Sequence, residues 1–139
     1  MKTSSRGFSL MELLVVLAII GIIVAIAMPS YDAYLRRGSR SAAQGFMMNV
    51  SGKQAQYLLD ARNYAVGSTA IADLGLAVPP EVTPFYDVAV ENGTGGTTVS
   101  VPPTYRVRAT PKAGTRQASD GELILTHNGT KTRGGTAGW

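Results

Sequence analysis

The feature that most constrains this chain is an apolar run of 21 residues, 8–28. As an α-helix the run is about 31 Å long, which matches the hydrocarbon core of a bilayer. Only Ser9 and Glu12 are polar within it. A carboxylate costs on the order of 2.5 to 3.5 kcal/mol at the centre of a membrane helix and less near its end, so a helix that only anchors gains nothing from Glu12. We therefore expect Glu12 to have a function, with a cation as its partner.

The residues on either side of the run predict its orientation. Residues 1–7 (MKTSSRG) contain Lys2 and Arg6 and no acidic residue. Positive charge stays on the cytoplasmic side, so the N-terminus is predicted to lie inside. The run is longer than the apolar part of a secretory signal and continues into Pro29, so ordinary signal cleavage is not expected to remove it. The predicted organisation is a leader (1–7), a transmembrane helix (8–30) and an outward-facing domain (31–139).

Length and composition limit that domain. About 110 of the 139 residues remain after the helix, enough for one small domain. The chain has no cysteine, so neither a disulfide nor a thiolate metal site can form. The formal charge is +4, but Lys2 and Arg6 supply two of the positives, which leaves +2 (11 minus 9) beyond residue 7. A charge that small does not by itself argue for nucleic acid.

The helical pattern continues beyond Pro29. Apolar residues recur at intervals close to 3.6 residues from 31 to 58, with polar residues mostly between them. A helix from residue 8 to about residue 60 is roughly 80 Å long, more than a membrane needs, so its second half is expected to pack on a folded domain. Pro29 is expected to bend or loosen the helix, and Gly21 is a second weak point.

The second half of the chain has the pattern of a β-sheet. Residues 63–84 are predicted to be irregular, with a turn of helix near 71–74. Short β-favouring runs follow at 85–90, 97–101, 104–110, 122–127 and 130–133. Asn92-Gly93 and Asn128-Gly129 are typical of hairpin turns, and the glycine-rich stretches 93–96 and 134–138 are expected to be mobile. The predicted fold class is α+β: a long N-terminal helix packed on an antiparallel sheet.

Chemistry-bearing residues are few. Arg36, Arg37 and Arg40 are interpreted as a solvated helix face beside the membrane, with the binding of phosphates from lipid or DNA as the alternative. His127 has no second histidine or cysteine with which to form a metal site, so no metal is expected. No paired carboxylates, catalytic triad or phosphate loop occur, so neither an enzyme nor a cofactor is expected.

These residues resemble a known family. The leader ending in Gly7, the sequence FSLMELLVV at 8–16, IGII at 20–23 and AMPSY at 27–31 are similar to the class III signal and transmembrane helix of type IV prepilins. Looser similarity continues through TYRVRATP at 104–111 to Trp139, and is greatest to the type IVa minor pilins.

The resemblance implies a mechanism of maturation and assembly. A prepilin peptidase would cleave after Gly7 and methylate the amine of Phe8. Glu12 would then pair with the terminal amine of a neighbouring subunit, which supplies the expected cation. The segment between Gly21 and Pro29 would lose helical order in the fibre. The implied partners are other pilin subunits, the peptidase and the inner-membrane assembly platform, and the implied location is the bacterial inner membrane, then the extracellular fibre.

One departure from the family concerns the C-terminal loop. Such pilins usually close it with a disulfide, whose two positions correspond here to Asp120 and Gly138. We expect the region to depend instead on the strand at 123–125 and on the Asn128-Gly129 hairpin.

Three functions remain open at this stage. The favoured one is a structural subunit, in particular a minor pilin, of a type IV pilus that supports adhesion, twitching motility or DNA uptake. The alternatives are a pseudopilin of the type II secretion system and a DNA-binding competence pilin.

Overall fold

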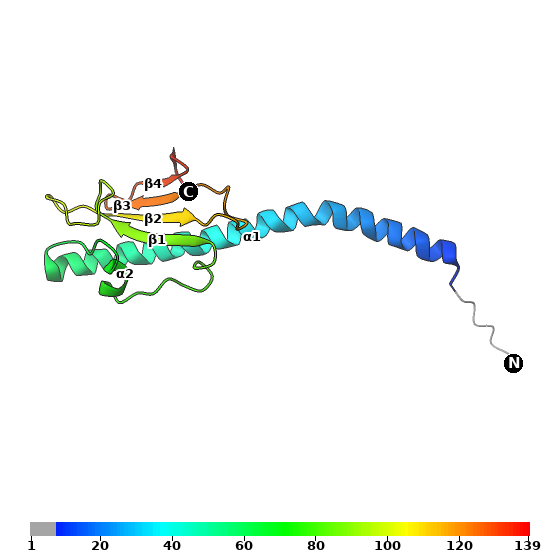
Figure 1. The fold of residues 1–139 in the computed structure, drawn as a ribbon, viewed down its shortest axis with the longest axis horizontal. Coiled ribbons are helices and arrows are strands. Elements are labelled where there is room, and N and C mark those ends of the chain that lie inside the picture. The colour runs from blue at the N-terminus through cyan, green and yellow to red at the C-terminus, as the bar shows by residue number, and fades with distance from the viewer. Residues whose placement is uncertain (1–7) are drawn as a thin grey trace. The chain divides into compact units, whose positions relative to one another are not determined.

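The computed structural model describes residues 8–139, which form two compact units. The first unit ends at Leu35 and the second comprises Arg36–Trp139. Helix α1 (Leu10–Ala61) contributes residues to both units (Figure 1). The boundary between the units lies five residues beyond the end of the expected transmembrane segment at residue 30.

In the first unit the chain is a helix without a fold around it. The amides of Glu12 and Leu13 donate to the carbonyl of Ser9 (3.0 and 3.2 Å), which begins the first turn. Helix α1 includes both Gly21 and Pro29, so the expected interruption does not divide it. A single proline removes only one backbone hydrogen bond, and the neighbouring turns keep theirs. By length and composition α1 is the one described helix that could cross a membrane, a test that a signal sequence also passes.

The second unit contains an antiparallel sheet. After α1 come the short α2 (Ala70–Asp73) and five strands in the order β1-β2-β3-β4-β5. The strands are β1 (Tyr86–Glu91), β2 (Arg106–Pro111), β3 (Leu123–Thr126), β4 (Lys131–Arg133) and β5 (Thr136–Ala137). The sheet lies along the second half of α1 (Figure 1). This arrangement confirms the predicted α+β fold.

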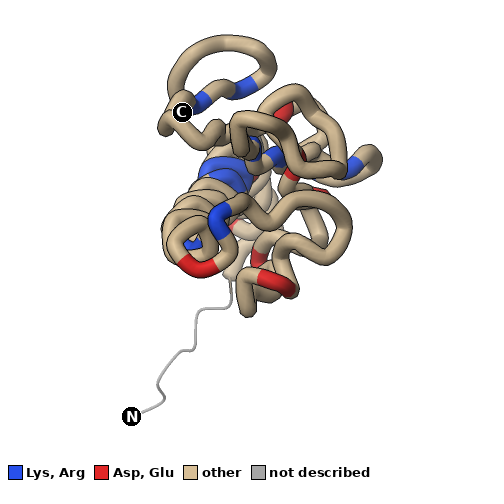
Figure 2. Tube along the Cα trace, turned by 90° about the vertical axis from the view of Figure 1, so that its left-hand side faces the viewer, with Lys and Arg blue, Asp and Glu red and all other residues tan. Residues whose placement is uncertain are grey.

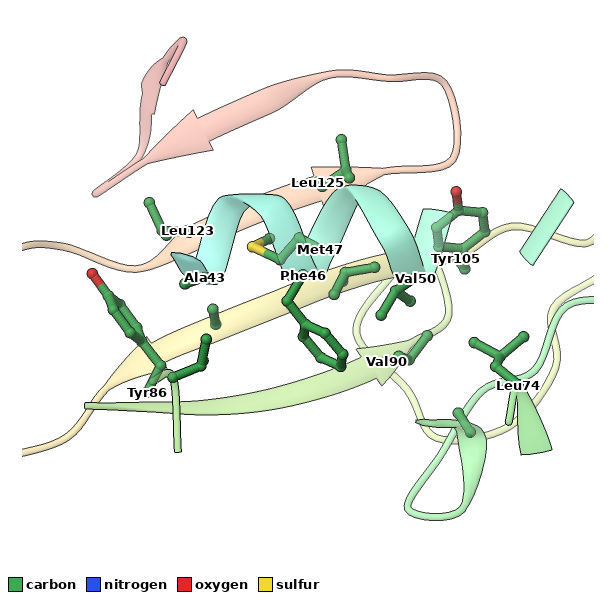
Figure 3. Packing of buried hydrophobic residues seen from close by; sticks show 14 of the residues in the cluster. Ala43, Phe46, Met47, Val50, Leu74, Tyr86, Val90, Tyr105, Leu123 and Leu125 are labelled. Carbon is green, nitrogen blue, oxygen red and sulfur yellow. The ribbon is translucent and has the colours of Figure 1, made fainter. Parts of the chain in front are cut away.

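The core forms where one stripe of α1 meets one face of the sheet. Ala43, Met47 and Val50 on the helix are fully buried, and Phe46 is nearly so. Alternate sheet residues cover them, namely Val90, Val107, Ala109, Leu123 and Leu125 (Figure 3). The predicted alternation in β2 is confirmed, because Tyr105, Val107 and Ala109 are buried while the arginines between them face outward.

The connection between β1 and β2 differs from the expected tight hairpin. Residues 97–101 form no strand, and the loop extends from Asn92 to Tyr105. Buried Asn92 organises this loop, because its Oδ1 accepts from the amides of Thr94 (3.0 Å) and Gly96 (2.7 Å) and its Nδ2 donates to the carbonyl of Thr98 (2.8 Å). The Asn92 side chain thus supplies the hydrogen bonds that the two strands would have made if a two-residue turn joined them. These bonds also fix the glycine-rich stretch 93–96.

The Asn128-Gly129 hairpin is confirmed. The Thr126 amide donates to the Thr130 carbonyl at 3.0 Å, and Gly129 adopts a positive φ of 82°. Strand β5 was not predicted. It is two residues long and rich in glycine on both sides, so no period-two pattern marks it.

Candidate functional site

The first candidate region is the N-terminal end of α1. Phe8 precedes the helix and its side chain is 76% exposed, while Glu12 lies in the first turn. An acidic residue at this end is favoured by the partial positive charge of the helix N-terminus. Gly7 and the proposed cleavage point lie outside the described residues. Gly21 is within the helix, where an added Cβ would meet nothing within 4 Å.

The apolar side chains of this region are not covered by the described residues of their own unit. The large ones from Leu10 to Met28 are all between 45% and 79% exposed. They point to every side of the helix, so no single surface of a soluble domain could cover them. A continuous apolar surface of this extent exceeds the few hundred Å² that soluble monomers expose. It requires lipid or the helices of other molecules around it.

The second candidate region is the set of arginines at the start of the second unit. Arg37 is exposed, and Arg36 and Arg40 are partly buried. Arg40 differs from the expected solvated residue, since its guanidinium binds both carboxylate oxygens of Asp120, with Nε 2.7 Å from Oδ2. The side chain of Asp120 is only 4% exposed. Arg40 is therefore a structural ion-pair partner within the domain.

The same carboxylate has a perturbed pKa. Burial alone raises the pKa of Asp120, but the hydrogen bonds from Arg40 and Tyr86 outweigh burial and lower it. The pKa of Arg40 is raised by its bond to Asp120. Both shifts favour the charged forms of the pair.

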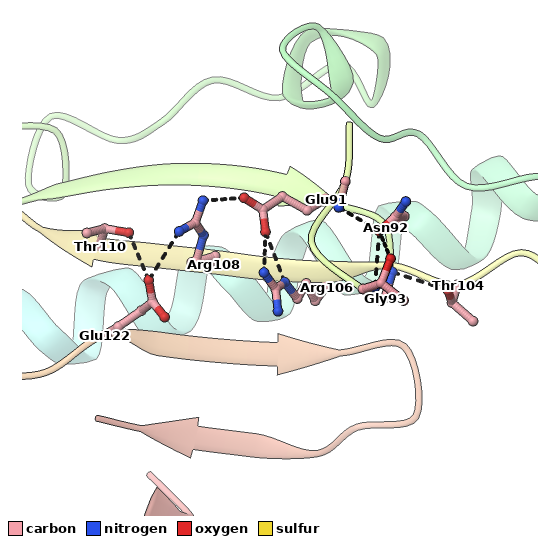
Figure 4. A network of polar contacts seen from close by, with 10 residues as sticks. Glu91, Asn92, Gly93, Thr104, Arg106, Arg108, Thr110 and Glu122 are labelled. Carbon is pink, nitrogen blue, oxygen red and sulfur yellow. Dashed lines mark hydrogen bonds and ion pairs between the residues drawn. The ribbon is translucent and has the colours of Figure 1, made fainter. Parts of the chain in front are cut away.

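The outer face of the sheet carries a second ion-pair network. Arg106 Nε donates to Glu91 Oε2 at 2.9 Å, and Arg108 binds the other oxygen of Glu91 (Figure 4). Arg108 also lies 3.4 Å from Glu122. The register explains the meeting, because Glu91 on β1 is opposite Arg106 on β2. Glu91 and Glu122 thus neutralise Arg106 and Arg108. The alternating sequence of β2 places these two arginines on the outer face of the sheet.

The second unit has a higher formal net charge than the chain beyond residue 7 as a whole. Lys2 and Arg6 of the 13 basic residues, and Glu12 and Asp32 of the 9 acidic ones, precede it, so Arg36–Trp139 has a formal charge of +4 (11 minus 7). Figure 2 shows Lys and Arg residues in blue and Asp and Glu residues in red at many places along the tube.

Two further cations rest on aromatic rings. The Arg116 guanidinium carbon lies 4.2 Å from the centroid of Phe85, and Lys131 Nζ lies 4.6 Å from that of Trp139. The sequence alone did not point to Arg116 or Lys131. Isolated cations in a loop or a short strand have no distinctive pattern, so only the fold identifies these contacts.

Arg116 extends the basic region of α1. Its Nη2 is 3.5 Å from the hydroxyl of Ser39, and the next residue, Gln117, donates to the carbonyl of Arg36 at 3.2 Å. Segments about eighty positions apart in the sequence thus meet. Arg36, Arg37 and Arg116 together are called the basic end of the domain below.

Comparison with known proteins gives the class to which this architecture belongs. Residues 29–123 match a family described as "Type IV minor pilin ComP, DNA uptake sequence receptor", and residues 2–28 match the "Prokaryotic N-terminal methylation motif". An apolar N-terminal helix that continues into a sheet-covered domain is the architecture the resemblance implied. The chain therefore belongs to the type IV pilin family. Within that family it belongs to the minor pilins named in the first of the two descriptions.

Individual relatives agree with that assignment. The chain is 34% identical over 96 residues to the type IV major pilin protein PilE1 of Neisseria gonorrhoeae, covering 67% of this chain and 52% of the relative. It is 39% identical over 75 residues to the fimbrial protein EcpC of Eikenella corrodens, covering 50% and 49%. It is 32% identical over 86 residues to the type IV wide pilus major component PilA4 of Thermus thermophilus, covering 62% and 66%. The match to the first two spans about half of their length.

Proposed function

We propose that this chain is a subunit of a type IV pilus, held in the inner membrane by residues 8–28 before assembly and joined to other subunits through the same helix afterwards. The observation that carries the proposal is the exposed apolar run with one carboxylate, Glu12, which lies within the matched methylation motif at residues 2–28. Lipid covers the run before assembly, and neighbouring helices cover it in the fibre.

Processing is the step that makes this assembly work. Cleavage between Gly7 and Phe8 by a prepilin peptidase would remove the basic leader and create a terminal amine four residues before Glu12. In the fibre that amine would pair with Glu12 of a neighbouring subunit. The pair would satisfy both charges in an environment without water, which neither charge could tolerate alone.

Intact-mass analysis of sheared fibres tests this proposal. We expect a chain that begins at Phe8 and carries one added methyl group on its amine. A subunit recovered from fibres with Lys2 and Arg6 still attached would contradict the processing step. Absence of the chain from fibres that assemble normally would contradict the structural role.

A second function is DNA binding by the domain, as the description of the matching family states for its members. The support in this chain is the charge of +4 on Arg36–Trp139 and the basic end formed by Arg36, Arg37 and Arg116. Guanidinium groups bind phosphate oxygens in pairs, and each phosphate contact makes the affinity fall with salt.

Salt-dependent binding of a duplex to the fragment 30–139 tests DNA binding. This fragment retains the whole hydrophobic core, which extends from Ala42 to Trp139. We expect Arg37→Ala combined with Arg116→Ala to weaken binding by about tenfold or more and to reduce the salt slope by roughly two. The matched control, Lys53→Ala combined with Arg62→Ala, removes two charges at the other end of the packed half of α1. Equal losses in both double variants would refute a role for the basic end, and no binding at 50 mM salt would refute the function.

A further inference from the structure

The segment 112–121, which joins β2 to β3, is held in place without hydrophobic side chains. Its sequence, KAGTRQASDG, contains no apolar residue larger than alanine, and Ala113 and Ala118 are both exposed. Burial of apolar area therefore contributes little to fixing it. Its position must come from polar contacts, and this segment is called the strap below.

The contacts of the strap converge on Asp120. Its Oδ2 accepts from Arg40 Nε at 2.7 Å and from the Tyr86 hydroxyl at 2.6 Å, while Oδ1 binds the second arm of Arg40. Gln117, which is fully buried, donates to the Tyr86 hydroxyl at 2.7 Å and to the carbonyl of Arg36 at 3.2 Å. The strap is thus tied to α1 and to β1 at once.

The other two charged side chains of the strap, Lys112 and Arg116, reach the surface. Arg116 lies over Phe85 at the surface, and Lys112 Nζ lies 3.2 Å from an Asp87 whose side chain is 75% exposed. Surface pairs of this kind contribute little, because water competes for both charges. Asp120 is different, since it is almost completely excluded from water and an unpaired carboxylate there would be strongly disfavoured. The positive charge of Arg133 on β4 also lowers the pKa of Asp120.

We propose that Arg40 and Asp120 are a non-covalent latch that closes the strap onto α1, and that the strap opens as a unit when the latch is removed while the sheet stays folded. Asp120 occupies one of the two positions at which the resemblance places a cysteine. The latch therefore holds that end of the C-terminal loop on α1, and its closure requires no oxidation. The glycines near its ends, Gly114 (φ 75°) and Gly121 (φ 84°), permit the backbone turns that a hinged segment needs.

Hydrogen exchange of the full chain in detergent micelles, read by mass spectrometry, tests the latch. The amides of Ala118 and Asp120 donate to the carbonyls of Thr115 (3.1 Å) and Gln117 (2.7 Å) in short turns within the strap. We expect such short turns to lose their protection once the strap leaves α1. In Asp120→Asn we expect exchange in peptides covering 112–121 to rise by at least tenfold, with new tryptic cleavage after Lys112 and Arg116. Peptides covering β3 should exchange as in the native chain.

The control is Asp87→Asn, which breaks the exposed pair to the same strap and should leave its exchange unchanged. If Asp120→Asn does not fold, Tyr86→Phe removes one of the hydrogen bonds to the carboxylate and should produce a smaller rise confined to the strap. Unchanged exchange in the strap of the folded Asp120→Asn variant would refute the latch. So would a rise of equal size in the strap and β3, because it would mean that the strap does not open separately.

Discussion

The two halves of α1 are one helix with opposite relations to their surroundings. From Leu10 to Met28 the large apolar side chains point in all directions and remain half-exposed or more. In the half after Arg36 the buried apolar positions form one stripe, Ala43, Phe46, Met47 and Val50, and the opposite side is exposed. The difference shows that the second half packs on the chain's own sheet, whereas the described residues of the first unit do not cover the first half.

The largest effect is expected from changing the one carboxylate of the first half. In Glu12→Leu, incorporation into fibres should fall at least a hundredfold, because an incoming amine would lose its counter-charge at a cost of roughly 3 to 5 kcal/mol. Membrane insertion and cleavage after Gly7 should persist. Quantitative immunoblots of sheared fibres and of membranes measure the two.

Two further variants test whether the carboxylate of Glu12 causes the loss of incorporation. Glu12→Gln should behave like Glu12→Leu, and Glu12→Asp should be intermediate, since its carboxylate is one methylene shorter. Normal recovery of Glu12→Leu in fibres would eliminate the pairing with Phe8 and leave the first half as a plain anchor.

The second largest effect concerns the stripe of the second half. Met47→Ala removes a fully buried side chain and should lower the free energy of unfolding of the domain by about 2 to 5 kcal/mol. The neighbouring Met48 is 48% exposed, so Met48→Ala should change the free energy of unfolding by less than about 0.5 kcal/mol. Urea denaturation of both variants measures the difference. Similar values would mean that the packed stripe is assigned to the wrong face.

The third prediction uses pH to test how the second half is attached to the strap. The ordinary pKa of an aspartate is near 3.8 and that of Asp120 is lower in the folded domain. Its contribution to stability is therefore fully present above pH 4 and is lost as pH falls through the lowered value. At pH 7, the strap of Asp120→Asn should exchange its amides about tenfold faster than the native strap or more, and this ratio should narrow at pH below about 3.8. A ratio independent of pH, measured by hydrogen exchange of peptides covering 112–121, would assign the effect to packing.

The smallest expected effect is an increase in the stability of the domain. An added Cβ at Gly45 would meet nothing within 4 Å, so Gly45→Ala should stabilise the domain by about 0.5 to 1 kcal/mol through the higher helix propensity of alanine. Gly21→Ala is the matched change in the first half and should leave the unfolding of the domain unaltered. Thermal unfolding of both variants decides whether the two halves are energetically separate.

Several features of the fold were predictable because they are local. The apolar run and Glu12 are contiguous in the sequence, and the alternation of Val107 and Ala109 with arginines identifies β2 without reference to any other strand. The Asn128-Gly129 turn was recognisable for the same reason, since its positive φ is required within four residues. The similar dipeptide Asn92-Gly93 was misleading, because the Asn92 side chain caps a longer loop there.

The sequence by itself determined where the helix is apolar on all sides, where it becomes amphipathic and that an antiparallel sheet follows, since period and composition fix these properties over short distances. The tertiary structure alone decided how the charges are used. Arg40 and Asp120 are eighty positions apart, and Glu91 meets Arg106 and Arg108 only through the register of β1 on β2. Which acidic residues pair with Arg40, Arg106 and Arg108 depends on those long-range contacts. No local pattern encodes them, because a side chain's partner is set by the packing of the whole domain.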